Sequence, residues 1–351
     1  MKDKIERLKE CSRHLPFVTA HLPGVGGEIK AEPEHFNVEE ILPYAPCGEG
    51  EHLFVTLRRA GWNTADVAAA LADRLDLKSV DVGWGGRKDK RAVTTQTFSL
   101  HLPVAVTNAQ AEAALAELPF ELLAVQRHRN KLKTGHVAGN RFRILLTQVG
   151  PDALTVAEPV ADEIRRHGIP NYYGEQRFGF HMANIDRAMH LAERGRPARS
   201  KKDAFVVSVL QSALFNLWLT ERMARDQYQA ILSGDVVQKT DTGGLFVVED
   251  VEEASERFLK GAITYTGPIF GPKMKAAADV AAQYESRILD DVDLSLDAFK
   301  RLRAPGARRM AVLTVDDLAI RQEETGLHFT FTLPRGAYAT MVMREFMRAD
   351  G

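Results

Sequence analysis

The sequence predicts an α+β protein, with a mixed, largely antiparallel sheet and flanking helices that are interrupted by a mainly helical α+β region. Three observations lead to this fold class. Strand-like segments between Gly and Pro turns fill the early part of the chain, whereas the pattern turns mostly helical from residue 183 to about 303. Strand signals then return near the end, so the helical region interrupts an α+β domain.

The first half of the chain alternates between helical and strand patterns. Residues 3–13 are expected to form a short helix, because single apolar residues recur among charged ones. Residues 64–77 have apolar residues at helical spacing, with Thr64 as the expected N-cap, and a second helix is expected near 108–118. The predicted strands are 28–31, 36–42, 52–59, 80–84, 92–102, 120–129 and 141–147.

The second half contains the clearest helix. Residues 201–224 form a long stretch with an apolar face, which makes the helical region a candidate second domain. Residues 310–315 and 327–333 are strand-like again. Residues 336–347 are expected to form a closing helix.

Length and composition indicate a soluble, folded protein. The 351 residues, 45% of them hydrophobic, suffice for a large core, and no apolar run approaches the roughly 20 residues that cross a bilayer. The N-terminal residues lack the apolar stretch of a signal peptide, so a cytoplasmic location without membrane contact is expected. The two cysteines, Cys11 and Cys47, provide neither a disulfide framework nor a thiolate metal site.

Charge is unevenly distributed along the chain. The formal net charge is −1, but residues 81–150 carry a net charge of +5 and residues 201–300 a net charge of −5. A basic segment of this kind fits a polyanionic ligand such as nucleic acid, and the alternative is two ordinary solvated faces. The motifs inside the basic segment are therefore informative.

One carboxylate in the basic segment lies among four cations, directly after two glycines. Asp89 has Arg87 and Lys88 before it and Lys90 and Arg91 after it. Cations this close lower the pKa of a carboxyl group, which suits a nucleophile or base that must carry its charge. The glycines permit a tight turn with Asp89 at its tip beside a groove, although an exposed, ion-paired loop explains the same residues.

Residues 127–143 form a second basic motif, with six Lys or Arg, two His and no acidic residue. Such cations provide most of the sequence-independent affinity for nucleic acid, and an aromatic ring among them offers a face to an unstacked base. Phe142 is the candidate ring, and Asn140 would lie on the same side of an extended strand. The alternative for Phe142 is a buried core position.

Other patterns narrow the function further. Residues 170–179 are rich in aromatic and amide side chains, and packing is the preferred interpretation for Tyr172 and Phe178. Glu39 and Glu40 are adjacent on a strand and point to opposite faces, which excludes a glycosidase pair. No phosphate-binding loop, dinucleotide-binding, HExxH or EF-hand motif occurs, so neither a cofactor nor a metal ion is implied.

Four separated motifs together resemble one family. GGRKDKRAVTTQ, KLKTGHVAGNRF, PNYYGEQRFG and LPRGAYATMVMRE are similar to motifs of the TruD family of tRNA pseudouridine synthases and occur in the same order. EPEHFNVEE and GEGEHLFV extend the resemblance over nearly the whole chain. It implies a pseudouridine synthase catalytic domain over 1-154 and 304-351, interrupted by a TRUD insertion domain over 155-303.

The resemblance also implies the roles of individual residues. The implied site consists of the catalytic Asp89 and the substrate-binding Lys30, Phe36, Arg91, Asn140 and Phe142. The expected contacts to the RNA backbone are Arg87, Lys88, Lys90, Arg127, Arg129, Lys131, Lys133 and Arg141. His35 departs from the Asp that the family commonly has before the Phe, which leaves the hydrogen bonding of that loop open.

The family isomerises uridine 13 in a subset of tRNAs, so the resemblance implies tRNA as the partner and the same reaction here. The target base would leave the helix stack and lie against Phe142. Asp89 would then add to the base, attack the sugar carbon, or take a ribose proton to form a glycal, and the sequence does not choose among these steps. An internal rearrangement needs no cofactor.

A monomer without an obligate protein partner is expected. The alternative function, from another class, is a non-catalytic RNA-binding or RNA-chaperone protein that uses the same basic cleft. A nuclease is a third interpretation, but it would usually need paired acids that hold metal ions. The presence of Asp89 among its cations favours the enzyme.

Overall fold

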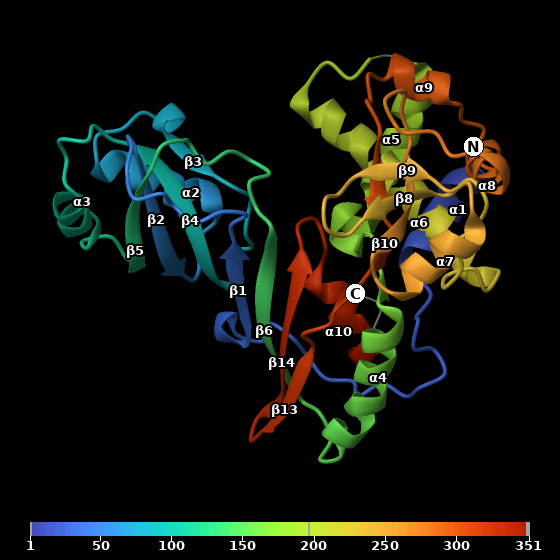
Figure 1. Ribbon diagram of the computed structural model, residues 1–351, viewed down its shortest axis with the longest axis horizontal. Helices are drawn as coiled ribbons and strands as arrows, with labels where there is room; N and C mark the ends of the chain where they lie inside the picture. Colours follow the sequence, from blue (N-terminus) through green and yellow to red (C-terminus); the bar gives the residue numbers. More distant parts are fainter. Residues whose placement is uncertain (1, 196, 349–351) are drawn as a thin grey trace. The chain divides into compact units, whose positions relative to one another are not determined.

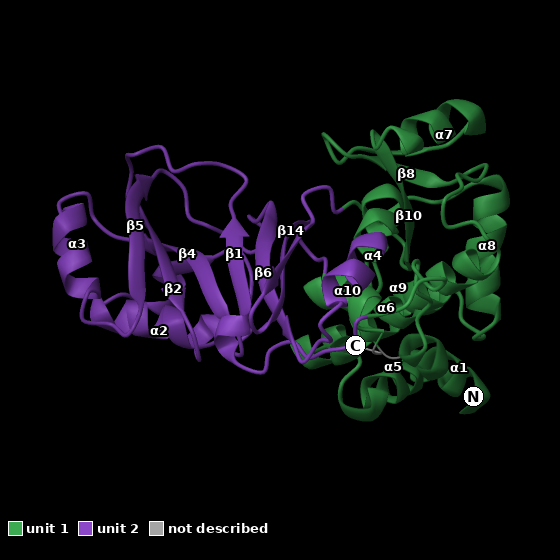
Figure 2. Cartoon of the chain, turned by 90° about the horizontal axis from the view of Figure 1, so that it is seen from below, with its two compact units in different colours: residues 1–24, 160–314, 338–351 green, residues 25–159, 315–337 purple. Residues whose placement is uncertain are grey.

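The computed structural model describes residues 2–195 and 197–348 and divides them into two compact units (Figures 1 and 2). We call Val25–Pro159 with Val315–Ala337 the sheet unit, and the remaining described residues the helical unit. Residues 2–24 and 338–348 thus group with the helical unit, and the first helix, residues 2–13, packs against two helices of that unit. The predicted boundaries at 154/155 and 303/304 separate the catalytic domain from the insertion domain of the family, and they stay a prediction.

An eight-stranded mixed sheet forms most of the sheet unit. Its strand order is β13-β14-β6-β1-β4-β2-β5, with β3 paired to β4; β1 and β4 are parallel, and the other pairs are antiparallel. This arrangement confirms the predicted fold class. The strands are β1 (Phe36–Ile41), β2 (His52–Arg59), β3 (Val82–Trp84), β4 (Val93–His101), β5 (Glu121–His128), β6 (Gly139–Thr147), β13 (Ala319–Glu323) and β14 (Gly326–Pro334).

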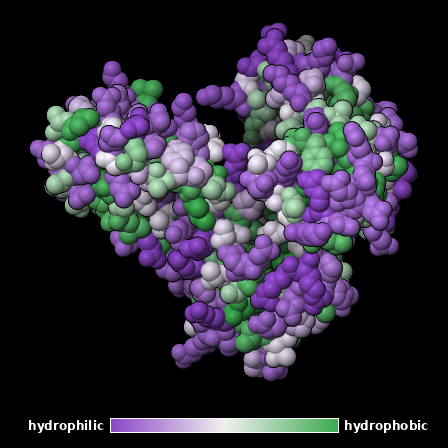
Figure 3. All heavy atoms as spheres, in the orientation of Figure 1, coloured by the Kyte–Doolittle hydropathy of each residue, from purple (hydrophilic) through white to green (hydrophobic). Residues whose placement is uncertain are grey.

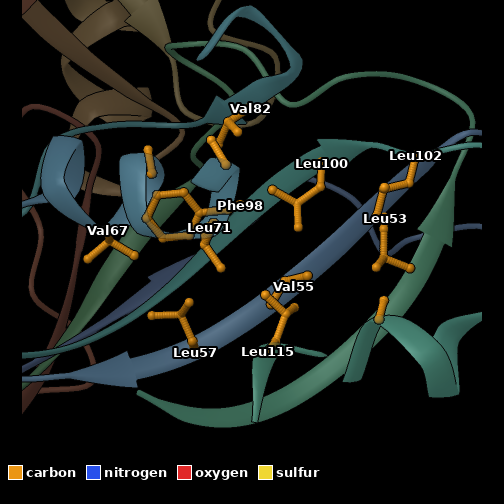
Figure 4. Close-up of a cluster of buried hydrophobic side chains, with 13 residues drawn as sticks. Leu53, Val55, Leu57, Val67, Leu71, Val82, Phe98, Leu100, Leu102 and Leu115 are labelled. Atoms are coloured by element: carbon orange, nitrogen blue, oxygen red, sulfur yellow. The ribbon is translucent and has the colours of Figure 1, made fainter. Parts of the chain in front are cut away.

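Helices α2 (Thr64–Arg74) and α3 (Asn108–Leu115) cover one face of this sheet. Leu53, Val55 and Leu57 alternate along β2 and pack with Leu71 of α2 and Leu115 of α3 (Figure 4). Each buried aliphatic side chain of this kind contributes about 1.5 to 3 kcal/mol relative to an exposed one. The cluster therefore holds α2 and β3 against the sheet, and with them the start of the loop that follows β3.

Two local predictions in the sheet unit were wrong. Asn63 is the N-cap of α2, because its side chain accepts hydrogen bonds from the backbone N–H groups of Ala65 and Asp66, and Thr64 is the first helical residue. Residues 28–31 form no strand: Glu28 makes one isolated bridge to Thr147, and Lys30 has a left-handed backbone with φ of 61°. A strand cannot continue through a left-handed residue.

The helical unit is built around one long central helix, α6 (Lys201–Ala224). By length and composition this helix could cross a membrane, whereas the sequence analysis expected no apolar run of that length. However, 72% of its apolar window is buried inside the protein. It is therefore a core helix of this unit. The other helices are α1 (Lys2–Arg13), α5 (Ala183–Arg194), α7 (Val251–Leu259), α8 (Asp279–Asp290), α9 (Leu296–Arg301) and α10 (Ala339–Met347), with α4 (Ala153–His167) continuing from the sheet unit.

The helical unit also contains short strands, and the sequence pattern revealed only β12 (Val312–Leu313), which lies within the predicted strand 310–315. A four-stranded sheet has the order β11-β10-β8-β9. Tyr172 and Phe178 are fully buried in this unit, which confirms their interpretation as packing residues. The strands are β7 (Ile169–Pro170), β8 (Val236–Lys239), β9 (Leu245–Val247), β10 (Ile263–Ile269), β11 (Ala307–Met310) and β12 (Val312–Leu313).

The surface seen in Figure 3 is mainly hydrophilic, with apolar residues in small patches among charged ones. Scattered apolar surface is normal for a folded protein and marks no site by itself. The candidate site must therefore be found from the chemistry of particular side chains.

Candidate functional site

The loop between β3 and β4, which carries Asp89, is anchored at three points. The carbonyl of Gly85 accepts from the Gly135 N–H at 2.8 Å, and the carbonyl of Gly86 accepts from Gln96 Nε2 at 2.7 Å. The N–H of Lys88 donates to Thr64 Oγ1 at 2.9 Å. Thr64, which was predicted to be a helix cap, thus anchors this loop. The three hydrogen bonds together fix the position of the backbone before Asp89.

Gly85 has a steric reason to be glycine. A Cβ atom there would lie 2.5 Å from Cγ2 of Val137 and 3.0 Å from the carbonyl oxygen of His136. Such distances are well inside van der Waals contact, so any side chain would push the loop away from residues 136–137. Gly85, which was predicted to permit a tight turn, therefore allows the Asp89 loop to pack closely against residues 136–137.

Asp89 carries an ionised carboxylate at the tip of this loop. Lys30 Nζ lies 2.9 Å from Oδ2, and the Arg91 N–H donates to Oδ1 at 3.0 Å, while 41% of the Asp89 side chain stays exposed. Partial burial raises the pKa of Asp89, but the N–H of Arg91 and the Lys30 ammonium lower it more, so the net pKa lies below the ordinary value. Each oxygen keeps lone pairs for a further partner.

Lys30 connects the carboxylate to an aromatic cluster. Its ammonium nitrogen lies 4.3 Å from the ring centroid of Phe36, in cation–π range. Its positive φ is rare for a residue with a side chain, and such strain is typical of functional sites. Lys30 and Phe36 were predicted to reach one pocket with Asp89, and the fold brings these three residues together.

The aromatic cluster extends across three strands. The ring of Phe36 meets that of Phe142 edge-on at 6.1 Å, and Phe142 lies 5.5 Å from Phe331. Strand register explains the contact, because Phe142 of β6 is paired with Phe331 of β14. Only 6% of Phe142 is exposed, so it occupies the buried position that was the alternative interpretation of this residue.

A buried polar network lies beside Asp89. Lys88 Nζ donates to Asn140 Oδ1 at 2.6 Å and pairs with Glu40 Oε1 at 3.0 Å. The side chain of Lys88 is 7% exposed and that of Glu40 is fully buried. Lys88 was predicted to contact the RNA backbone, and this does not fit its position, because its ammonium is committed to an interior carboxylate and amide.

The network continues beneath the loop through Gln96. Its Nε2 lies 3.4 Å from Glu40 Oε1, and its Oε1 accepts from Arg59 Nη2 at 2.9 Å. Burial lowers the pKa of Arg59 to about 10, while Glu40 opposes that shift. Glu40, Gln96 and Phe331 were not predicted as parts of the site. For Glu40 a signal existed, because alternation along β1 places it on the same face as Phe36.

The remaining predicted cations differ in what they contact. Arg127 is buried and donates to the carbonyl groups of Leu102 and Val106, so a contact with an RNA backbone does not fit its position. Arg129 is exposed and pairs with Glu49. Arg143 is exposed too and pairs with Glu39. The other predicted cations that are exposed are Arg87, Lys90, Arg91, Lys133 and Arg141.

The loop around His35 is closed without an acidic residue at that position. Asn37 Nδ2 donates to the carbonyl of Glu34 at 2.6 Å, which closes the short turn before β1. His35 Nε2 lies 3.9 Å from Glu32 Oε2. The orientation of Phe36 therefore depends on Asn37 and on strand pairing.

Within residues 2–195 and 197–348, no group of three His, Cys, Asp or Glu side chains is placed to hold a metal ion.

Known proteins resemble this chain over almost its full length. A tRNA pseudouridine synthase D of Anaeromyxobacter dehalogenans is 43% identical over 345 residues, which cover 96% of this chain and 97% of that protein. One of Thermus thermophilus is 41% identical over 340 residues, covering 95% and 92%. A crystal structure described as a putative tRNA pseudouridine synthase D from Methanosarcina mazei has the same fold, with a TM-score of 0.76, 22% identity, and coverage of 97% and 98%.

These relatives define the class of the protein as an isomerase, a pseudouridine synthase. The family model described as tRNA pseudouridine synthase D (TruD) matches residues 15–188 and 199–346. The chain belongs to the tRNA pseudouridine synthase D family.

Proposed function

We propose that the protein converts uridine 13 of certain tRNAs to pseudouridine, with Asp89 as the catalytic carboxylate. The observation that supports this most is the pairing of the half-exposed Asp89 with Lys30, directly beside the Phe36 ring. The substrate is suggested by the names of the relatives, which are tRNA pseudouridine synthases. The exposed cations around the loop provide charge for binding a phosphate backbone.

The reaction breaks the bond between uracil N1 and ribose C1′ and forms a bond from uracil C5 to the same C1′. The proton on C5 is lost and N1 gains one, so the product is an isomer of the substrate. A carboxylate that is already ionised can attack or take a proton without first losing its own. Attack on the base, attack on C1′, and glycal formation through a ribose proton all use Asp89 in this state.

Asn140 is oriented for a hydrogen bond to the substrate. Because the Lys88 ammonium can only donate, the atom of Asn140 that faces it at 2.6 Å must be the carbonyl oxygen. The amide nitrogen then points elsewhere, and within the described ranges it donates to no other group. We infer that Asn140 Nδ2 donates to a uracil carbonyl, which would position the base while it turns.

The aromatic cluster would receive the target base. Extruding a base from the RNA stack costs a few kcal/mol, which contact with aromatic rings and phosphate-binding cations offsets. Phe142 is mostly buried between Phe36 and Phe331. It would therefore touch the base only with the exposed edge of its ring, and it would also hold the Phe36 ring in place. We further propose that the protein acts as a monomer in the cytoplasm.

Pseudouridine mapping tests the proposal directly. Unmodified tRNA transcripts incubated with the purified protein are expected to gain one pseudouridine, at position 13, detected by carbodiimide labelling and primer extension. A transcript with cytidine at position 13 is the control and should gain none. Tight tRNA binding without any pseudouridine would instead indicate the non-catalytic RNA-binding alternative. Modification at another uridine would contradict the assigned position.

Phe142→Leu is expected to lower kcat/KM roughly 5-fold, the low end of the about 1 to 3 kcal/mol that an aromatic contact with a base is worth, because only an edge of this ring is open. Leucine keeps most of the buried volume, so the free energy of unfolding should fall by less than about 1.5 kcal/mol. Single-turnover rates and urea melts measure the two effects. Full turnover in the leucine variant would mean that the ring serves only the core.

Affinity for tRNA is expected to fall steeply with salt. If only three of the exposed cations contact phosphates, raising NaCl from 50 to 200 mM should weaken binding roughly 20- to 40-fold, from the log-linear release of counterions. Filter binding or fluorescence anisotropy across this range gives the slope. A slope near zero would place binding on another, uncharged surface.

A further inference from the structure

A pocket lies in the sheet unit, at the opposite end of β4 from the Asp89 loop. It has a volume of about 460 Å³ and is open to solvent at one side. The lining residues are Tyr44, His52, His128, Arg129, Asn130, Lys131, Lys133 and His136. Neither the proposed reaction nor the aromatic cluster uses this pocket.

Aromatic rings line one side of the pocket. His52 of β2 is paired in register with His101 of β4 and with His128 of β5, so three imidazoles stand side by side across three strands. The ring of Tyr44 stacks on His128, with centroids 5.1 Å apart and planes 18° apart. Tyr44 Oη lies 2.9 Å from His136 Nδ1, which fixes the orientation of the phenol.

The lining of the pocket also includes cationic side chains. Lys133 is exposed and makes no ion pair within the described part of the chain, whereas Arg129 is paired with Glu49 and Lys131 donates to the carbonyl of Val80. His52 Nδ1 is buried and has no hydrogen-bond partner among the described residues. Burial lowers the pKa of His52, and the nearby His101 and Lys131 lower it further, which reflects the positive potential there.

The pocket and the candidate active site are joined by one chain segment. Residues 129–138 leave β5 at the pocket, bond to the Asp89 loop through Gly135, and enter β6 just before Asn140. A ligand that follows this segment would touch both places. Aromatic faces beside a single free cation are the features with which proteins bind one nucleotide of a single strand.

We propose that this pocket binds a nucleotide of the RNA substrate other than the target uridine, with its base against Tyr44 and His128 and its phosphate on Lys133. The inference rests on the proposed function, because it takes RNA as the ligand. The pocket would then hold the strand in register while the target base turns at Asp89.

Two substitutions in the pocket test this with distinguishable effects on tRNA binding. Lys133→Ala is expected to raise Kd roughly 5-fold at 0.1 M salt and to lower the salt slope by about 0.7, as for the loss of one phosphate contact. Tyr44→Ala is expected to raise Kd roughly 10-fold without changing that slope, because only stacking is lost.

Arg321→Ala is the matched control, because Arg321 is exposed on β13, at the opposite edge of the same sheet from β5. Tyr44→Phe keeps the stacking ring and should retain affinity, which separates stacking from a folding defect. Histidine NMR signals of the Asp89→Asn protein provide a direct readout: those of His52, His128 and His136 should shift when tRNA is added.

The outcomes separate this inference from the proposed function. If tRNA is bound and modified but both pocket variants match Arg321→Ala in Kd and salt slope, the pocket inference is overturned and the proposed function stands. Histidine signals that do not move on saturation with tRNA would overturn it as well. If the wild-type protein neither binds nor modifies tRNA, the proposed function itself fails.

Discussion

Replacing Asp89 with Asn is expected to lower the single-turnover rate of pseudouridine formation by on the order of 10³-fold or more. The amide has nearly the same shape as the carboxylate, but it can neither attack nor accept a proton. Because Asp89 is paired with Lys30 at the loop tip, the change removes one negative charge from a basic surface. The Kd for tRNA should therefore change by less than about threefold.

The pH profile gives an independent check of Asp89. Because its folded pKa lies below the ordinary value of 3.8, the ionised form persists as pH falls, and kcat/KM should be lost only below that value. Lys30→Met removes one of the groups that lower the pKa and should move this acid limb to higher pH. An asparagine variant that keeps more than a tenth of the wild-type rate would contradict the catalytic assignment.

Replacing Lys88 with Met is expected to lower the free energy of unfolding by about 3 to 5 kcal/mol, because it leaves the carboxylate of Glu40 buried without its cation. The same change removes the donor that orients the Asn140 amide, so turnover of the folded fraction should fall as well. Urea unfolding followed by circular dichroism measures the first effect, and single-turnover kinetics at low temperature the second.

A double substitution distinguishes a lost charge pair from a general packing defect. In Glu40→Gln combined with Lys88→Met, both members of the buried pair are neutral, so part of the stability should return while the turnover defect persists. The recovery is incomplete because the buried Arg59 loses the Glu40 charge that opposes its desolvation. Lys90→Met is the matched control, since Lys90 is an exposed lysine of the same loop and should cost less than about 0.5 kcal/mol. Equal losses in Lys88→Met and Lys90→Met would show that the Glu40 pair contributes little.

Much of the fold follows from local patterns. Strand-like segments between turn residues predicted β1, β2, β4, β5, β6 and β14 within about two residues. The short strands of the helical unit were not predicted from alternation, since β8 to β11 have three to seven residues each and take their partners from distant segments. Motif order, rather than periodicity, led to the family, which the comparisons confirmed.

The sequence by itself determined the α+β class, the family, and Asp89, Asn140 and Phe142 as a candidate set. Only the tertiary structure decided that Lys88 and Arg127 are buried, that Phe142 lies between two other rings, and that a row of histidines borders a pocket. The physical reason is register. Composition and periodicity act over a few neighbours, whereas the partner of a side chain across a sheet depends on how strands from distant parts of the chain align.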